Sequence, residues 1–309
     1  MRALLVDRSA PAGLRLGSAP DPEPAPNQVL VRVAATSLNH GEVTHLVPGA
    51  DAGTVLGWDA SGVVERAAAD GSGPAVGTRV VTLGLAGAWA ELRAVDTELV
   101  GVAPVGADLA ALSTVPVAGA SALRALHRLG PLLGRKVLVT GASGAVGRYA
   151  VQLARLGGAE VVAMTSNPDV YGDSMRELGA GQVIADPAEL DGRVDGVLDL
   201  VGGPQMVAAF ESLAEGGTLV SVGHTTGAPE QFPFGTFSGD AGRHDRSIVT
   251  FFLLGCRDLG RDLTWLADRV AAGVLDPQVV WRGDWSAADE AVTALRDRRL
   301  HGKAVLELG

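Results

Sequence analysis

The sequence predicts an α/β protein that combines a doubly wound parallel sheet with a second, β-rich domain. The first observation is at residues 136–157, where a short apolar strand runs through a glycine-rich turn into an amphipathic helix. The second is the alternation of strands and helices that follows residue 110 or so. The third is the region before it, where short strand candidates are separated by Gly and Pro. Together they predict two domains in 309 residues.

The glycine-rich turn predicts a dinucleotide site. Gly141 permits the sharp bend, Gly144 lets the backbone approach a pyrophosphate, and Gly147 lets the helix pack closely on the strand. The free N–H groups at the start of the helix would then face the phosphates. A generic strand-to-helix turn is the alternative, and the βαβ alternation around the turn favours the dinucleotide site. The predicted phosphate-binding residues are Gly141, Ala142, Ser143, Gly144, Ala145, Val146 and Gly147.

Composition and charge exclude several classes of protein. A formal net charge of −10 argues against a nucleic-acid partner, which would need clustered Lys and Arg. The single cysteine, Cys256, excludes an intrachain disulfide and a multi-cysteine zinc knot. The sequence begins without an apolar signal region, and none of its apolar runs approaches the roughly 18 residues of a membrane span. We expect a cytoplasmic protein without a membrane partner.

The predicted elements suggest where the domains divide. Strands are expected at 3–6, 29–35, 60–65, 78–83 and 90–95, and then at 160–165, 182–185, 194–200, 217–222 and 247–253. The tail supplies a helical stripe over 259–270, a strand at 278–281, a helix opened by Ser286 with Asp289 in capping-box spacing, and a final strand at 303–308. The final strand needs a pairing partner, and the β-rich domain is the expected host. We therefore predict a β-rich domain of residues 1–112 with 275–309, and a dinucleotide-binding domain of residues 113–274.

Seven collinear segments carry a resemblance to a known family. The order of these parts resembles the medium-chain dehydrogenase/reductase superfamily, and within it the zinc-independent quinone oxidoreductase branch. The resemblance implies a Rossmann-type domain, a GroES-like catalytic domain, a nicotinamide cofactor and a homodimer that pairs through the strand at 247–253. The matching segments are residues 31–42, 56–64, 115–119, 137–147, 176–180, 195–203 and 302–306.

The zinc site of metal-dependent relatives lacks its ligands here. By motif alignment those places look like Asn39, Trp58 with Asp59, and the stretch around Ala118, so neither Cys nor His remains there. Without soft or imidazole ligands we expect no metal. A hydride acceptor must then be electron-poor enough to react without a Lewis acid, which points to a quinone or an α,β-unsaturated carbonyl.

The residues after the second strand of the dinucleotide domain bear on the cofactor. NAD-specific folds place an acid there, whereas this chain has Ser166 and Asn167. The resemblance implies NADPH, with these two residues near the 2′-phosphate. Tyr171 stands where many NADPH-using relatives carry Lys, and Asp169 is near enough to act as the acid. Arg176 is a candidate for the missing positive charge, with a solvated helix position as the alternative.

The resemblance also supplies catalytic candidates. It puts Asn39 beside the nicotinamide, where an amide can bond the cofactor or a carbonyl oxygen, although Asn39 can also be a turn residue. Glu42 would orient its neighbours. His45, like His40, is either a proton donor or a surface-loop histidine. Trp58 is either a pocket wall or an ordinary packed aromatic, and Ser121 aligns near a hydroxyl that faces the nicotinamide.

Further cofactor contacts are expected at strand ends. Gly223, His224 and Thr225 follow the fifth strand of the sheet at its carboxyl end, where ligands gather in open α/β sheets. Of Phe251 and Phe252, one is expected in the core and the other at the nicotinamide. Lys303 is either a cofactor-side residue or a solvated lysine.

These expectations amount to a zinc-free, NADPH-dependent reductase of quinones or enones. A tailoring enoyl reductase of a biosynthetic pathway shares the chemistry and differs in its acceptor. A non-catalytic NADPH-binding sensor or partner protein shares only the binding site.

Overall fold

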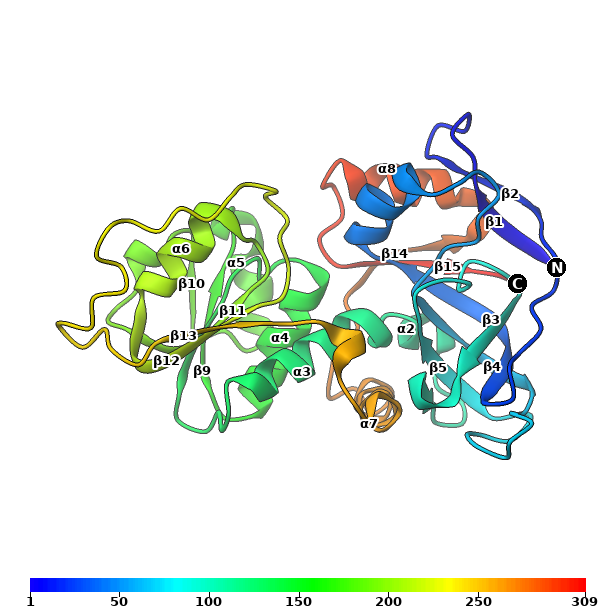
Figure 1. Cartoon of the computed structure of the whole chain (residues 1–309), viewed down its shortest axis with the longest axis horizontal. Coiled ribbons are helices and arrows are strands. Elements are labelled where there is room, and N and C mark those ends of the chain that lie inside the picture. Colours follow the sequence, from blue (N-terminus) through cyan, green and yellow to red (C-terminus); the bar gives the residue numbers. More distant parts are fainter. The chain divides into compact units, whose positions relative to one another are not determined.

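The computed structural model describes residues 1–309, and its internal contacts divide the chain into two compact units. One is formed by Met1–Ala120 together with Cys256–Gly309, and the other by Ser121–Gly255. We refer to them as the β-rich unit and the Rossmann unit (Figure 1). The α/β class and the pairing of a parallel sheet with a β-rich domain are confirmed. None of the helices is both long and apolar enough to cross a bilayer.

The Rossmann unit is built on one six-stranded sheet in which every pairing is parallel. The strand order is β10-β9-β8-β11-β12-β13, in which the chain starts in the middle and winds outward in both directions. The strands are β8 (Lys136–Val139), β9 (Glu160–Met164), β10 (Gln182–Ile184), β11 (Val194–Asp199), β12 (Leu213–Ser221) and β13 (Ser247–Thr250). The helices are α3 (Ala120–Arg128), α4 (Ala145–Leu156), α5 (Pro168–Glu177) and α6 (Gly203–Glu211), with short 3₁₀ turns η4 (Pro187–Glu189) and η5 (Leu253–Gly255).

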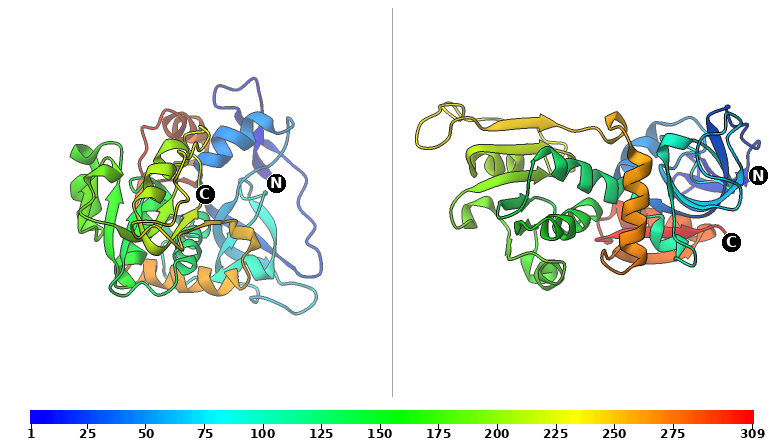
Figure 2. Two further views of the ribbon diagram at one scale, coloured as in Figure 1. Left: turned by 60° about the vertical axis from the view of Figure 1, so that its left-hand side comes forward. Right: turned by 90° about the horizontal axis from the view of Figure 1, so that it is seen from below.

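The central strands of this sheet are apolar because helices cover both faces. Leu138, Val162 and Val197 are fully buried and pack with Phe210 of α6 in one core cluster. The edge strand β13 is exposed and ends at Thr250, shorter than the predicted 247–253 (Figure 2).

The β-rich unit contains a seven-stranded sheet and a separate hairpin. The sheet follows the order β14-β15-β3-β4-β5-β7, with β6 also paired to β3, and only the β14–β15 pairing is parallel. Its strands are β3 (Gln28–Leu38), β4 (Asp59–Arg66), β5 (Arg79–Leu83), β6 (Leu92–Asp96), β7 (Val100–Val102), β14 (Val279–Asp284) and β15 (Lys303–Glu307). The hairpin is β1 (Arg2–Val6) with β2 (Leu14–Ser18). As expected, the carboxyl-terminal strand pairs with the amino-terminal region, since β15 lies antiparallel to β3.

Helices and single helical turns connect these strands. They are the π-helical turns η1 (Glu42–Leu46) and η3 (Val115–Gly119), α1 (Val47–Gly49), α2 (Leu109–Leu112), α7 (Leu259–Ala271), α8 (Ala288–Arg296), and the 3₁₀ turns η2 (Thr97–Leu99) and η6 (Trp285–Ala287). Helix α8 begins at Ala288 without a side-chain cap, so the predicted Ser286–Asp289 capping box is wrong. Instead Asp284 accepts a hydrogen bond from Ser286 N and starts η6.

Helix α7 belongs to the β-rich unit, and this moves the predicted boundaries. The sequence assigned residues 259–270 to the dinucleotide domain, whereas α7 packs on β7 (Figure 2). Two glycines make this contact possible. A Cβ at Gly101 would lie 2.5 Å from Leu263 Cβ, and one at Gly260 would lie 2.7 Å from Val100 O. The units therefore divide after Ala120 and after Gly255, where the sequence predicted 112 and 274.

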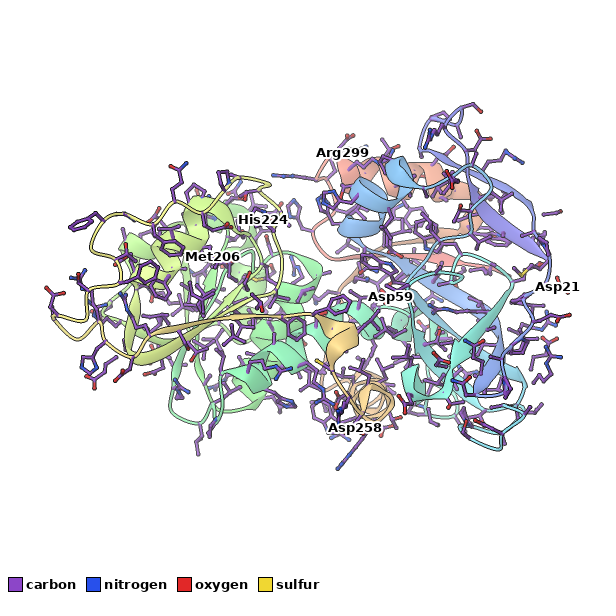
Figure 3. All side chains as sticks on the ribbon, viewed as in Figure 1. Asp21, Asp59, Met206, His224, Asp258 and Arg299 are labelled. Atoms are coloured by element: carbon purple, nitrogen blue, oxygen red, sulfur yellow. The ribbon has the colours of Figure 1, made fainter.

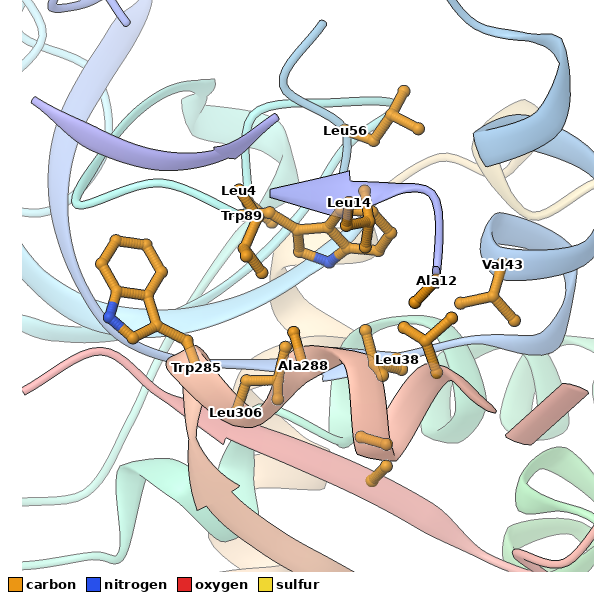
Figure 4. Packing of buried hydrophobic residues seen from close by; sticks show 14 of the residues in the cluster. Leu4, Ala12, Leu14, Leu38, Val43, Leu56, Trp89, Trp285, Ala288 and Leu306 are labelled. Atoms are coloured by element: carbon orange, nitrogen blue, oxygen red, sulfur yellow. The ribbon is translucent and has the colours of Figure 1, made fainter. Parts of the chain in front are cut away.

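The main core of the β-rich unit joins elements from both of its segments. Trp89, Leu4 and Leu14 from the amino-terminal segment pack in one cluster with Trp285 and Leu306 from the carboxyl-terminal segment (Figure 4). Burying an aromatic or aliphatic side chain of this size contributes roughly 1.5–3 kcal/mol. The last 50 or so residues are therefore integral to this unit.

Candidate functional site

The glycine turn between β8 and α4 has the geometry of a phosphate-binding loop. Gly141 has φ +59°, which favours glycine, and a Cβ at Gly147 would lie 2.5 Å from Gly141 O and 2.6 Å from Ala142 Cα. Gly147 therefore lets α4 start directly against the turn. At Gly144 a Cβ would meet only Gly141 O, at 3.3 Å, so the outer side of this glycine is open. No side chain caps the amino terminus of α4. The residues present fit a nucleotide pyrophosphate.

The other two helices that follow strands of this sheet have occupied amino termini. Asn167 caps α5 through its side chain, which accepts from Val170 N. At α6 the Glu230 carboxylate accepts from Gly203 N at 2.9 Å. The Asn167 cap occupies the amino terminus of α5, and the Glu230 carboxylate at α6 would repel phosphate. Of these three helices, α4 therefore offers the open amino terminus for an anion.

Polar side chains brace the turn from within. Thr165, after β9, donates to Ser143 Oγ at 3.1 Å, and Arg148 Nε donates to Ser143 O at 2.9 Å. Helical periodicity puts Arg148 on the polar face of α4, but only 6% of it is exposed. Helical periodicity could not reveal this buried guanidinium beside the turn, because Arg also occurs on ordinary solvated faces.

The predicted 2′-phosphate region lies at the carboxyl end of β9. Ser166 and Asn167 are exposed there, and Tyr171 is half-buried on α5. Arg176 is wrong as the source of positive charge. It lies near the far end of α5, bonds Asp173, and lines a surface depression with Gly158 and Glu160 at the amino end of β9.

The turn after β11 forms the neighbouring part of the same sheet edge. Asp199 accepts from Thr140 Oγ1 at 2.7 Å and from Gly202 N at 3.0 Å, and burial raises the pKa of its carboxyl. Gly223 N donates to Asp199 O, so the ends of β11 and β12 are tied together. Next to them His224, labelled in Figure 3, and Thr225 are exposed.

Four predicted site residues lie outside these clusters. Phe251 is half-buried and Phe252 is 68% exposed, so the expectation that one of them is core is wrong. Both follow the end of β13 rather than lying in it. His45 is exposed on η1, and Ser121 is buried at the start of α3.

The β-rich unit holds a buried network around Asp59, at the positions that motif alignment matched to the zinc ligands of metal-dependent relatives. Lys303 Nζ donates to Asp59 Oδ2 at 3.0 Å and to Asn39 Oδ1 at 2.8 Å. Asn39 Nδ2 donates to Asp59 Oδ2 and to Glu42 Oε2, both at 2.9 Å. Lys303 is fully buried, which excludes the alternative that it is a solvated surface lysine. The position of Asp59 is labelled in Figure 3.

Asp59 is the centre of this network and accepts four hydrogen bonds. Besides Lys303 and Asn39, its donors are Ser37 Oγ at 2.8 Å and Val117 N at 2.7 Å. The donors come from β3 and the residue that follows it, from β15 and from η3, so one carboxylate connects three separate segments. Both π-helical turns touch the network, η1 through Glu42 and η3 through Val117. Such turns occur frequently at functional sites.

The charges in the network influence one another. Burial, followed by the nearby charge of Asp59, raises the pKa of Glu42 to about 7. Hydrogen bonds from Asn39 and from Trp58 N oppose that rise. Arg93 is also fully buried, and burial lowers the pKa of its guanidinium to about 10. Arg93 donates to the carbonyl oxygens of Trp58 and Thr82.

The neighbours of Asn39 determine its orientation and limit its role. An ammonium can bond only to the amide oxygen, and carboxylates only to the amide nitrogen, so the orientation is unambiguous. Both amide protons are used by Glu42 and Asp59. Asn39 therefore has no N–H left for a carbonyl oxygen, and only its Oδ1 can accept another donor. Trp58 is half-buried, with its ring 3.1 Å from a Cβ placed on Gly41 and its indole nitrogen without a partner.

The donor set around Asp59 does not fit a zinc ion. Asn39 and Trp58 are not zinc ligands, and all of the Asp59 carboxylate is engaged by N–H and O–H donors. The structure contains no cluster of three or more His, Cys, Asp or Glu side chains that could hold a metal.

Comparison with known proteins identifies the class. Residues 25–105 match the family model for an alcohol dehydrogenase GroES-like domain, and residues 178–306 match the model for a zinc-binding dehydrogenase. The chain is 31% identical to the "Probable zinc-binding oxidoreductase, mitochondrial" of Arthroderma benhamiae, over 93% of this chain and 91% of that protein. The chain belongs to the medium-chain dehydrogenase/reductase superfamily, and its Rossmann unit has the fold of that superfamily's nicotinamide-binding domain.

Two further likenesses bear on substrate. The chain is 33% identical to erythronolide synthase EryA2 of Saccharopolyspora erythraea over 92% of its own length, although it spans only 8% of that protein. It superposes on a crystal structure of 2-haloacrylate reductase with a TM-score of 0.85 and 25% identity, covering 100% of this chain and 99% of that one.

Proposed function

We propose that this protein is a zinc-free, NADPH-dependent reductase that passes a hydride to a quinone or an α,β-unsaturated carbonyl. The observation that carries the proposal is the Asp59 network, in which Lys303 and amide groups saturate the carboxylate that a metal would need. A reductase of this class then requires an acceptor that takes a hydride without metal activation. The likeness to a reductase of an acrylate derivative supports such an acceptor.

The chain's own residues would bind the cofactor at the sheet edge. The open amino terminus of α4 receives the pyrophosphate, and Gly144 allows its close approach. Ser166 and Asn167 offer small polar groups to a 2′-phosphate, and no acid stands at these two positions. When bound, the reduced nicotinamide supplies the hydride. Asn39 Oδ1 is left as a hydrogen-bond acceptor for the cofactor or the substrate.

An enoyl thioester is a second candidate acceptor. It is favoured by the likeness to a segment of a polyketide synthase system protein over 97% of this chain. Its double bond is conjugated to a carbonyl, so its reduction follows the same course as that of an enone.

The test is loss of the reduced-nicotinamide absorbance with quinones, enones and enoyl thioesters, using NADPH and NADH in parallel. We expect turnover with at least one acceptor class, a higher kcat/KM with NADPH, and no loss of activity after treatment with a chelator. Equal kcat/KM for the two cofactors would refute the NADPH preference. Tight NADPH binding without turnover in any class would indicate a nucleotide-binding protein that is not an enzyme.

A further inference from the structure

A histidine–glutamate pair lies at the carboxyl end of β12. His224 Nε2 lies 2.7 Å from Glu230 Oε1, and the same oxygen accepts from Gly203 N at 2.9 Å. The imidazole ring packs on Gly202, where a Cβ would lie 2.4 Å from His224 Cδ2. His224 is therefore held on two sides while 44% of its side chain stays exposed.

The pair is on the nicotinamide side of the expected dinucleotide path. A Cβ on Gly141 would lie 3.3 Å from Leu200 Cβ, and one on Gly223 would lie 3.0 Å from Leu200 O. The edge is therefore continuous from the phosphate turn through Leu200 to His224. With the pyrophosphate at α4 and the ribose that carries the 2′-phosphate toward β9, the nicotinamide half of the dinucleotide would extend toward β11 and β12.

The hydrogen bond to Glu230 leaves one ring nitrogen for chemistry. A carboxylate accepts, so Nε2 carries a proton and Nδ1 takes a second proton when the ring becomes an imidazolium. The backbone N–H of Gly203, and then the bond to His224, lower the pKa of the Glu230 carboxyl and keep it ionised. The carboxylate fixes the orientation of the imidazole ring, as in other histidine–carboxylate pairs. His224 Nδ1 has no hydrogen-bond partner within the chain.

We propose that His224 is the proton donor that completes reduction of an α,β-unsaturated carbonyl, an inference that rests on the proposed function. The hydride enters at the β-carbon, and the electron pair of the double bond moves to the carbonyl oxygen as an enolate. The enolate α-carbon then takes the proton from Nδ1, which forms the C–H bond and leaves a neutral imidazole. Solvent reprotonates Nδ1, because the ring is exposed.

The charged surroundings of His224 are simple. Glu230 contacts it directly, and Asp199 is buried behind Gly202 at the end of β11.

A quinone gives an internal comparison, because its product protonates on oxygen, which exchanges protons with water without a positioned acid. The test variant is His224→Gln, which keeps an amide for Glu230 but has no acidic proton. The matched control is His244→Gln. His244 is likewise an exposed histidine paired with acids, but it lies near the amino end of β12, where its carbonyl accepts from Gly216 N.

With an α-methyl enone in D₂O, we expect wild-type protein to place deuterium on one face of the α-carbon. His224→Gln should lower kcat for this enone by about 100-fold, near the lower end of general-acid contributions, and lose the facial selectivity. Its quinone kcat should fall at least tenfold less than its enone kcat, because no positioned acid is needed for a quinone. Its NADPH affinity, measured on the protein without acceptor, reports separately any contribution of His224 to cofactor binding. His244→Gln should match wild type throughout.

The outcomes separate this inference from the proposed function. Failure of wild-type protein to reduce any acceptor contradicts the proposed function itself. If His224→Gln reduces the enone at the wild-type rate and with wild-type facial selectivity, His224 is not the proton donor. The proposed reductase function is then unaffected. Equal losses for both acceptors, together with weaker NADPH binding, would make His224 a cofactor-binding residue and also overturn the inference. Wild-type protein that reduces quinones but no enone would also overturn the inference.

Discussion

At the scale of single residues, the Asp59 network is the most constrained part of the molecule. Asp59 and Lys303 are both fully buried, and each is neutralised by the other. A buried ion pair is costly to assemble, but the removal of one partner is costlier because the other charge stays behind without compensation. The network therefore makes stability sensitive to changes that would be harmless on the surface.

Lys303→Met should lower the free energy of unfolding by about 3–5 kcal/mol, because it strands the Asp59 carboxylate. Urea denaturation measures this. The chain's other lysine provides the control: Lys136 forms a looser 3.6 Å pair with an exposed Glu160, so Lys136→Met should cost no more than about 1 kcal/mol. Asp59→Asn combined with Lys303→Met should recover part of the loss. A Lys303→Met protein as stable as Lys136→Met would contradict the ion-pair geometry.

Glu42 should give stability a pH dependence of unusual sign. Its folded pKa of about 7 lies above the ordinary 4.5, so between these values the unfolded chain has lost a proton that the folded chain keeps. A rise in pH from about 4.5 to about 7 therefore lowers the free energy of unfolding by about 3 kcal/mol. In Glu42→Gln this contribution disappears, so the difference in stability between about pH 5 and about pH 8 should change accordingly. Glu177→Gln, at an exposed position on α5, should keep the wild-type profile.

At the scale of elements, the contact between α4 and the glycine turn after β8 depends on the absence of a side chain at Gly147. Gly147 faces backbone atoms, which cannot move aside as a flexible side chain could. The same close approach places the free amides of α4 at the sheet edge. Packing and cofactor binding therefore share one structural cause.

Gly147→Ala should push α4 away from the turn, weaken nucleotide binding at least tenfold and destabilise the fold by roughly 1–3 kcal/mol, as overpacking does. Fluorescence titration with the reduced nucleotide and thermal unfolding measure the two effects. Gly181→Ala is the matched control, since its Cβ would meet only Val161 O at 3.8 Å, an ordinary contact. Normal nucleotide affinity in Gly147→Ala would argue against α4 as the phosphate site.

At the scale of the whole molecule, β13 leaves one edge of the parallel sheet unpaired. It pairs with β12 alone, and Ile248 on it is 36% exposed. A flat, exposed strand edge is a natural site for pairing with a second copy, which covers the edge through a twofold contact.

Light scattering should therefore give a mass twice the 31.5 kDa of one chain. Ile248→Lys should shift the mass to that of a monomer, since Lys on an edge strand opposes pairing. Val274→Lys, at an exposed apolar position outside this sheet, should leave the dimer intact. A wild-type monomer at micromolar concentration would refute the expectation of a homodimer.

The sequence by itself determined the fold class, the glycine turn and the resemblance to the superfamily, because each is encoded in neighbouring residues. Strand and helix periodicities and the spacing of Gly141, Gly144 and Gly147 are local signals. Tertiary structure decided what local patterns cannot express. Asn39 and Lys303 are 264 positions apart, and they meet only because β15 pairs with β3 in one register. For the same reason α7 joins the β-rich unit, since its contact depends on the space left at Gly101.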